Sequence, residues 1–425
     1  MSGALITLAI LLIAVVLFVT ELLPLAVTAL GVLISLVVTR ILTPEQAFQG
    51  FVNHNVILFC AMFVIGGALF ETGMANRIGG LVTHFAKTER QLLAGVMIVV
   101  ALMSGFLSNT GTAAVMIPAV LGIASRSGMR RSRLLMPLAF ASAMGGNLSL
   151  IGAPGNLIVD STLTKMTDGA AHFGFFSYAL IGLPMMVVAL AYFLSFGYKL
   201  LPDHEVADDG AFSDDIQPAA PWKQYLALGV LAATVLAMVF KSYVGLGMHV
   251  IGVVGALLLI VVGVMSESKA LRAIDARVIF LFAGMLPMAT AMQQTGLGRL
   301  LAESVVDWLG EAPSPRVLLS VLFVISAGLS QFMSNTATTA LLAPIGGAIA
   351  VGLGADPSAV LMAVCIGGSC AFATPLGMPA NTMVLGLGGY RFNDYVKAGW
   401  PLILMGYLVC VILLPMIWPF FPAAP

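Results

Sequence analysis

The chain has 425 residues, of which 60% are hydrophobic and only 9% are charged, with equal numbers of basic and acidic side chains. Soluble domains carry about 25% charged residues, so this composition is typical of a polytopic membrane protein built from apolar helices. No basic run with interleaved aromatic residues is present, which excludes an obvious nucleic-acid surface.

In the first half of the chain, two of the long apolar segments are not expected to form single helices that cross a membrane. Its apolar segments cover residues 3–20, 24–39, 55–71, 91–125, 134–170 and 173–199. One crossing needs about 20 residues, so 91–125 is too long for one helix and too short for two with a loop. We expect a re-entrant hairpin there. In 134–170 we expect a helix broken at residues 152–156, where glycine and proline release backbone groups.

The second half repeats this plan. Its apolar segments cover residues 223–240, 248–265, 277–294, 316–353, 358–390 and 397–420. The pattern S-x-F-x-S-N-T occurs at 104–110 and again at 330–336, and G-x-P-x-N occurs at 152–156 and 377–381. Two halves that agree in segment order and in two motifs indicate an internal repeat.

Each half has five crossings and one hairpin, and an odd number of crossings inverts the second half. If the first hairpin opens to the cytoplasm, fourteen of the nineteen Lys and Arg residues lie inside; the exceptions are Arg40, Lys165, Lys241, Arg299 and Arg316. The positive-inside bias favours this orientation. We therefore predict an all-α polytopic membrane protein, an inverted-repeat transporter with two re-entrant hairpins and two broken helices.

The hairpin tips carry the chemistry. Ser108, Asn109 and Thr110 precede a helical half whose unpaired N–H groups suit an anion. The preceding half ends with unpaired carbonyls, which suit sodium together with the Ser104 or Ser108 hydroxyl and the Asn109 amide oxygen. The second repeat supplies the same set, including Ser334, from the other side. An anion between the two tips, flanked by two sodium ions, is the arrangement that we expect.

The sequence also resembles a known family over nearly its whole length. The two Ser-Asn-Thr tips, residues 145–146 with 151–156, and residues 373–381 with 388–392 resemble the divalent anion/sodium symporters. This solute-carrier group moves sulfate and di- and tricarboxylates. The resemblance implies co-transported sodium, two or more ions, no organic cofactor, and a small divalent anion as substrate, either a dicarboxylate or sulfate or a sulfonate.

The resemblance also implies site residues. For the substrate they are Asn109, Thr110, Asn335 and Thr336, with Pro154 and Pro379 beside them and Asn156 and Asn381 closing the two motifs. For sodium they are Ser104, Ser108, Asn109 and Gly152 in one site, and Ser330, Met333, Ser334, Asn335 and Gly377 in the symmetric one.

Members of this family work as elevator homodimers, commonly in the bacterial inner membrane. By position, residues 1–72 and 223–294 would form scaffold helices, 73–89 and 295–311 arm helices, and 90–200 and 312–425 the two halves of the transport domain. Residues 201–222 would be an acidic cytoplasmic linker.

Other functions fit the sequence less well. A single polar cluster in a membrane helix is often interhelical glue, but two copies with paired downstream motifs favour a binding site. An intramembrane enzyme is disfavoured, because all five histidines lie at segment ends or in loops and no H-E-x-x-H or G-x-S-x-G is present. The remaining alternative is a proton-coupled or uncoupled anion exporter or exchanger of the arsenite-permease type. Neither tip has the carboxylate or histidine that a proton route would need.

Overall fold

The fold is helical throughout the residues that the computed structural model describes, which are 3–20, 22–80, 88–127, 129–202, 219–309 and 314–421. The helices of the first half are α1 (Gly3–Thr20), α2 (Leu25–Val38), α3 (Pro44–Phe48), η1 (Gln49–Val52), α4 (His54–Glu71), α5 (Met74–Gly80), α7 (Glu89–Ser104), α8 (Asn109–Ser127), α9 (Ser132–Gly145), η2 (Gly146–Leu148), α10 (Pro154–Met166), α11 (Ala179–Ser195) and η3 (Gly197–Leu200). Those of the second half are α12 (Pro221–Val239), α13 (Lys241–Val244), α14 (Met248–Val261), α15 (Glu267–Ala273), α16 (Ala276–Thr295), α17 (Leu297–Leu309), α18 (Pro315–Leu329), α19 (Asn335–Gly352), α20 (Ser358–Gly368), α21 (Pro379–Leu387) and α22 (Phe392–Ile417).

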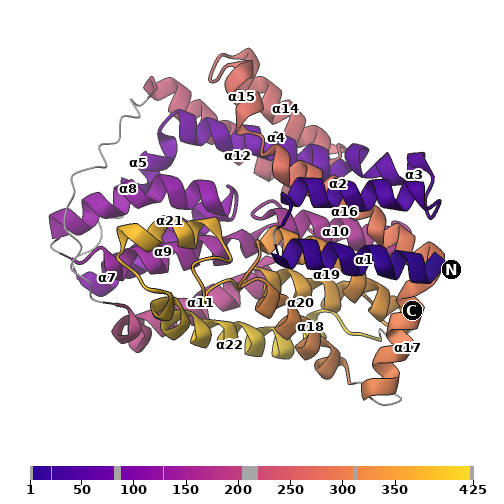
Figure 1. Ribbon diagram of the computed structural model, residues 1–425. Coiled ribbons are helices and arrows are strands. Elements are labelled where there is room, and N and C mark those ends of the chain that lie inside the picture. The colour runs from indigo at the N-terminus through magenta and orange to yellow at the C-terminus, as the bar shows by residue number, and fades with distance from the viewer. Residues whose placement is uncertain are drawn as a thin grey trace.

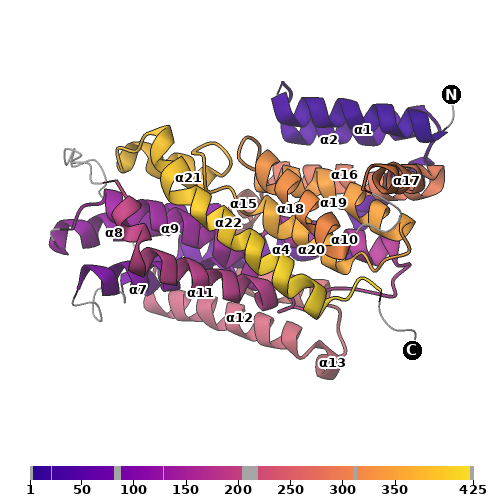
Figure 2. The ribbon, with the colours of Figure 1, turned by 90° about the horizontal axis from the view of Figure 1, so that it is seen from below.

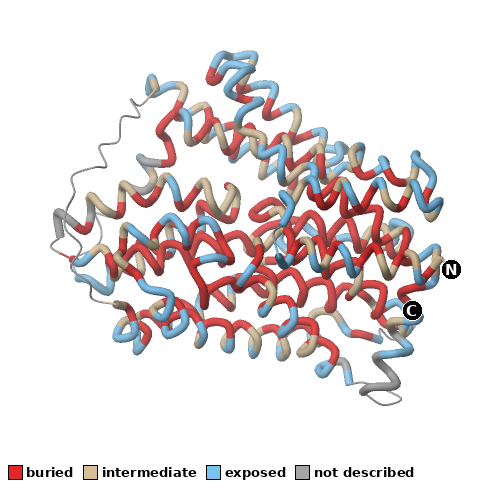
Figure 3. Tube along the Cα trace, viewed as in Figure 1, coloured by how far each residue is buried: buried red, intermediate tan, exposed pale blue. Residues whose placement is uncertain are grey.

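Most of the long helices run in a similar direction and surround a buried centre. Figure 1 shows α7, α8, α9 and α21 grouped on the left and α1, α2, α16 and α19 on the right. In Figure 2, α1 and α2 form one edge of the molecule. Buried residues are concentrated in the middle of the bundle (Figure 3). Among the described residues, five helices are long and apolar enough to span a membrane, and α1, α16 and α22 are three of them.

The long apolar segments 91–125 and 316–353 are both broken at the repeated S-x-F-x-S-N-T pattern. In the first repeat α7 ends at Ser104 and α8 begins at Asn109. In the second repeat α18 ends at Leu329 and α19 begins at Asn335. The two helices of each pair contact each other, and α7 and α8 lie together at the left of Figure 1. Neither segment is therefore a single continuous helix.

The two G-x-P-x-N motifs also interrupt a helix, but the interruption lies earlier than the sequence predicts. The expected break covers residues 152–156, whereas the structure is irregular at 149–153 and resumes as α10 at Pro154. In the second repeat, α20 ends at Gly368 and α21 begins at Pro379. Proline is favoured as the first helical residue because it has no N–H to leave unpaired and its φ is already helical. Each proline starts a helix rather than breaking one.

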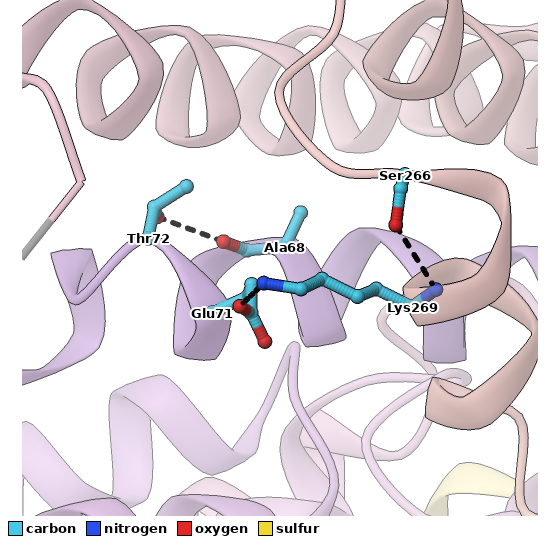
Figure 4. A network of polar contacts seen from close by, with 5 residues as sticks. All are labelled: Ala68, Glu71, Thr72, Ser266 and Lys269. Carbon is cyan, nitrogen blue, oxygen red and sulfur yellow. Dashed lines mark hydrogen bonds and ion pairs between the residues drawn. The ribbon is translucent and has the colours of Figure 1, made fainter. Parts of the chain in front are cut away.

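Short elements connect the long helices. The polar connectors expected at 73–89 and 295–311 contain the helices α5 and α17, each preceded by a glycine in the left-handed region, Gly73 at φ +77° and Gly296 at φ +70°. The end of α4 is tied to α15 by an ion pair between Glu71 and Lys269 (Figure 4). The acidic residues expected in the linker, from Asp203 to Asp215, lie outside the described residues.

Candidate substrate and cation site

A cavity of about 280 Å³ lies where the four helix breaks meet. The tips of both repeats line it, together with the residues that start α10 and α21. These lining residues are Ser108, Asn109, Thr110, Pro154, Ser334, Asn335, Thr336 and Pro379. Residues more than two hundred positions apart in the chain are thus brought to one small space, which is what an anion held between the two tips requires.

Each tip presents the N-terminus of a helix to this cavity. Ser108 Oγ accepts a hydrogen bond from the Gly111 N–H at 3.1 Å, and Ser334 Oγ accepts one from the Ala337 N–H at 3.2 Å. The N–H groups of the preceding residues, including those of Asn109 and Asn335, have no intrahelical acceptor. Two helix N-termini directed at one cavity create partial positive charge there without any charged side chain.

Behind the first tip, oxygen atoms cluster around the Asn109 amide. Asn109 Oδ1 lies 3.2 Å from the carbonyl oxygens of both Gly152 and Ser142. Ser104 Oγ is fully buried, lies 2.8 Å from Asn109 Oδ1, and donates to the Ser142 carbonyl at 2.6 Å. The cluster therefore joins the tip, the end of α9 and the broken segment before α10.

The second tip has a matching cluster. Asn335 Oδ1 lies 3.0 Å from the Gly368 carbonyl oxygen and 3.3 Å from that of Gly377. The Ser104 hydroxyl lies within hydrogen-bond distance of the Asn109 amide oxygen, whereas the buried Ser330 hydroxyl donates to the Ala327 carbonyl at 3.0 Å, in its own helix. Met333 is buried beside the tip.

Two arrangements can satisfy oxygens packed this closely. The asparagine amide can be rotated so that its NH₂ group donates to the carbonyls. Alternatively, a cation can lie between the oxygens. No group of three or more His, Cys, Asp or Glu residues able to hold a metal is found in the described part of the chain. Neutral hydroxyl, amide and carbonyl oxygens match a hard cation such as sodium and not a transition metal.

Glycine is required at two positions of these clusters. A Cβ added to Gly152 would lie 2.5 Å from the Gly146 carbonyl oxygen, and one added to Gly377 would lie 2.1 Å from that of Ser330. Both distances are far below contact, so a side chain at Gly152 would push the broken segment away from the end of α9, and a side chain at Gly377 would push it away from the end of α18. The glycines of the two motifs therefore allow the close backbone approach that forms the clusters.

Asn156 and Asn381 take a different place from the one expected of substrate residues. Both are fully buried and neither is among the residues that line the cavity. Asn156 Nδ2 donates to the carbonyls of Gly146 at 2.8 Å and Ser149 at 2.7 Å. Asn381 Nδ2 donates to the equivalent carbonyls of the second repeat, at 2.7 and 2.9 Å. These amides hold the broken segments in shape behind the site.

The structure adds site residues that the sequence reasoning missed. The carbonyls of Ser142 and Gly368 belong to the clusters, although their side chains carry no signal. Asp275 and Arg277, at the start of α16, line the same cavity. For the two carbonyls a signal did exist, because a helix that ends at a predicted break leaves its last carbonyls unpaired.

The fold is that of known membrane transporters. The structure superposes on the YdaH transporter of Alcanivorax borkumensis with a TM-score of 0.65, at 17% identity and covering 98% of each chain. It superposes on MtrF of Neisseria gonorrhoeae with a TM-score of 0.63, at 14% identity and covering 92% and 87% of the two chains. At these identities the likeness establishes the fold alone.

The chain belongs to the citrate transporter family, whose model matches residues 15–367 and 314–424. It is 27% identical to the uncharacterized transporter YfbS of Escherichia coli K12, covering 99% of this chain and 100% of the relative. It is 25% identical to the sodium-dependent dicarboxylate transporter SdcS of Staphylococcus saprophyticus, covering 93% of this chain and 82% of the relative. The predicted resemblance to sodium-coupled anion transporters is confirmed, as is the prediction of a transporter and not an enzyme.

Proposed function

We propose that this transporter takes up a small divalent anion, a dicarboxylate such as succinate, together with sodium ions. The observation that carries the proposal is the cavity in which the Asn109 and Asn335 tips face each other. The name of the SdcS relatives, sodium-dependent dicarboxylate transporters, supports the same substrate class and the same coupling ion. Sulfate and sulfonates would satisfy the same N–H donors and form the second substrate class to test.

The proposed substrate ligands are the tip residues Asn109, Thr110, Asn335 and Thr336. Their side chains are partly exposed and line the cavity, and their helices direct N–H groups at it. The prolines 154 and 379 close the cavity beside them. The buried amides of Asn156 and Asn381 then serve the site indirectly, by shaping the broken segments.

The proposed sodium sites are the two oxygen clusters. The first consists of Ser104 Oγ, the Asn109 amide oxygen and the carbonyls of Ser142 and Gly152. The second consists of the Asn335 amide oxygen and the carbonyls of Gly368 and Gly377. Because each asparagine belongs both to a cluster and to the cavity wall, sodium bound in a cluster would orient the tip that binds the anion. This shared residue provides a physical route for coupling.

The division into scaffold, arms and transport domain, the elevator movement, the homodimer and the bacterial inner membrane are part of the same proposal. In this proposal, the tips lie inside the apolar helical bundle as re-entrant hairpins at mid-membrane. Gly73 and Gly296, whose backbone is left-handed, lie at the start of the arms, between the scaffold and the transport domain that would move relative to it.

A proton-coupled exchanger remains the alternative. The carboxylate nearest the cavity, that of Asp275, accepts a hydrogen bond from the Arg277 N–H at 3.0 Å and caps α16. Asp160, the buried carboxylate of α10, accepts from Asn55 Nδ2 at 2.7 Å and from the Phe173 N–H at 2.8 Å. Both carboxylates thus have structural partners, and the oxygen clusters favour sodium.

Uptake of radiolabelled succinate into proteoliposomes tests the proposal. We expect accumulation with an inward sodium gradient and none when potassium replaces sodium. Uptake that is equally fast in potassium and follows a pH gradient would support the proton-coupled alternative. Competition by unlabelled sulfate and by a sulfonate separates the substrate classes.

A further inference from the structure

One wall of the cavity comes from outside the tips and the broken helices. Residues of α2, α4 and α16 form it, and the contribution of α16 is Asp275, Arg277, Val278 and Leu281. Positions 277, 278 and 281 lie on one face of a helix, so Arg277 is directed at the cavity with its two apolar neighbours.

The two charged residues of this wall differ in their hydrogen-bond partners. The Asp275 carboxylate is bound to the N-terminus of α16 through its hydrogen bond from the Arg277 N–H, where the helix dipole offsets its negative charge. The Arg277 side chain is exposed, and it makes no hydrogen bond or ion pair with any residue that the structure describes. A guanidinium offers several donors in a planar fork that matches a carboxylate. Arg277 is therefore the lining residue best placed to give positive charge to an anion.

The position of this wall also indicates which end of the cavity is open. Leu25 and Arg277 lie in the first turns of α2 and α16, which begin on the side expected to be cytoplasmic from the distribution of Lys and Arg. At the opposite end of the scaffold, the start of α4 is closed against α10. There Asn55 Nδ2 donates to Asp160 Oδ2 at 2.7 Å and to Ser161 Oγ at 2.9 Å.

We propose that Arg277 is a substrate-binding residue of the cytoplasm-facing state only. Its guanidinium binds the anion between the two tips while the cavity opens beside α16, and the contact is lost when the tips move to the other side of the membrane. This inference rests on the proposed function, because it requires an anionic substrate and a moving transport domain. A ligand stabilises one of two states only by binding it better, so Arg277 stabilises the loaded cytoplasm-facing state relative to the loaded external one.

Transport measured separately from each side of the membrane tests this inference, with succinate as the probe. Proteoliposomes with the protein in one orientation give KM for succinate presented at the cytoplasmic and at the external face. We expect Arg277→Gln to raise the cytoplasmic KM about tenfold and to leave the external KM within about twofold. A substitution in the protein cannot change the equilibrium of transport, so Vmax/KM must change by the same factor for influx and for efflux. A difference between the two faces therefore appears in KM and not in Vmax/KM.

Two further variants make the result specific. Arg277→Lys keeps the charge and should raise the cytoplasmic KM less than Arg277→Gln. Arg272→Gln removes the same charge five residues earlier, from α15, and should change neither KM because Arg272 does not line this cavity. Arg277→Gln protein that elutes as wild type from a sizing column excludes misfolding as the cause.

Equal KM changes on both faces, or no change on either, would overturn the role of Arg277 while leaving the proposed function intact. Absence of sodium-dependent succinate uptake by the wild-type protein would refute the proposed function and this inference together. The two failures are therefore distinguishable in one set of vesicles.

Discussion

The first turns of α4 and α16 are equivalent in the two repeats but have opposite surroundings. A Thr-Gly pair lies at the C-terminal end of each helix: Thr72 and Gly73 follow α4, and Thr295 and Gly296 close α16. The start of α4 is closed by the hydrogen bonds of Asn55 to α10, whereas the start of α16 faces the cavity through Arg277. Where tip, broken segment and amide meet, by contrast, the two repeats are nearly alike. The site itself is therefore nearly symmetric between the repeats, whereas its contacts with α4 and α16 are not. We expect this asymmetry in a transporter that alternates between two conformational states and is seen in one of them.

The largest expected effect tests the symmetric part. Asn109→Ala and Asn335→Ala each remove an amide that belongs to an oxygen cluster and to the cavity wall. Loss of a hydrogen bond to a charged group costs roughly 1.5–3 kcal/mol, so we expect each variant to lower sodium-driven succinate uptake about 10- to 100-fold. The measurement is initial uptake rate at subsaturating succinate. A variant that retains full activity in either repeat would show that only one tip binds substrate.

A smaller effect tests the asymmetric part. Asn55→Leu removes the donor to the buried Asp160 carboxylate and should lower stability by about 1–3 kcal/mol, seen as a lower thermal midpoint of the purified protein. Val278→Ala changes the equivalent position of α16, which faces the cavity, and should cost less than about 1 kcal/mol. Equal losses for the two variants would argue against the closed and open ends that we describe.

The smallest effect tests the support behind the site. The Tyr178 hydroxyl donates to the Asn156 carbonyl at 2.6 Å, and the Tyr395 hydroxyl donates to the Asn381 carbonyl at 2.7 Å. Tyr178→Phe and Tyr395→Phe each remove one such bond, and each should cost about 1 kcal/mol of stability. Thermal unfolding of both variants compares the repeats. Tyr192→Phe serves as the reference, because it removes a buried hydrogen bond outside the two motifs, from the Tyr192 hydroxyl to the Ala398 carbonyl at 2.9 Å. A loss of stability in only one of the two variants would mean that the equivalent hydrogen bonds of the two repeats do not contribute equally to stability.

Much of the fold was predictable because apolar length and repeated polar motifs are local signals. The breaks after Ser104 and Leu329 follow from polar phrases inside apolar segments, and both are found. The predicted bounds of the break at the G-x-P-x-N motif are wrong, since Pro154 and Pro379 start helices instead of interrupting them.

The cavity wall was less predictable. Arg277 meets the tips only through tertiary packing, which no spacing in the sequence reveals, and the Ser142 and Gly368 carbonyls have no side-chain signature. Asp160 was missed although it is a carboxylate within an apolar segment, which is itself a signal. The assignments of individual ligands to anion and sodium stay predictions.

Calorimetric titration of succinate into the purified protein, in sodium and in potassium, tests the central claim most directly. We expect binding in sodium and an affinity at least about tenfold lower in potassium, and we expect Asn109→Ala to weaken this sodium dependence because one of the two clusters is then incomplete. The same affinity in both salts for the wild-type protein would contradict the claim that the oxygen clusters hold sodium and orient the tips.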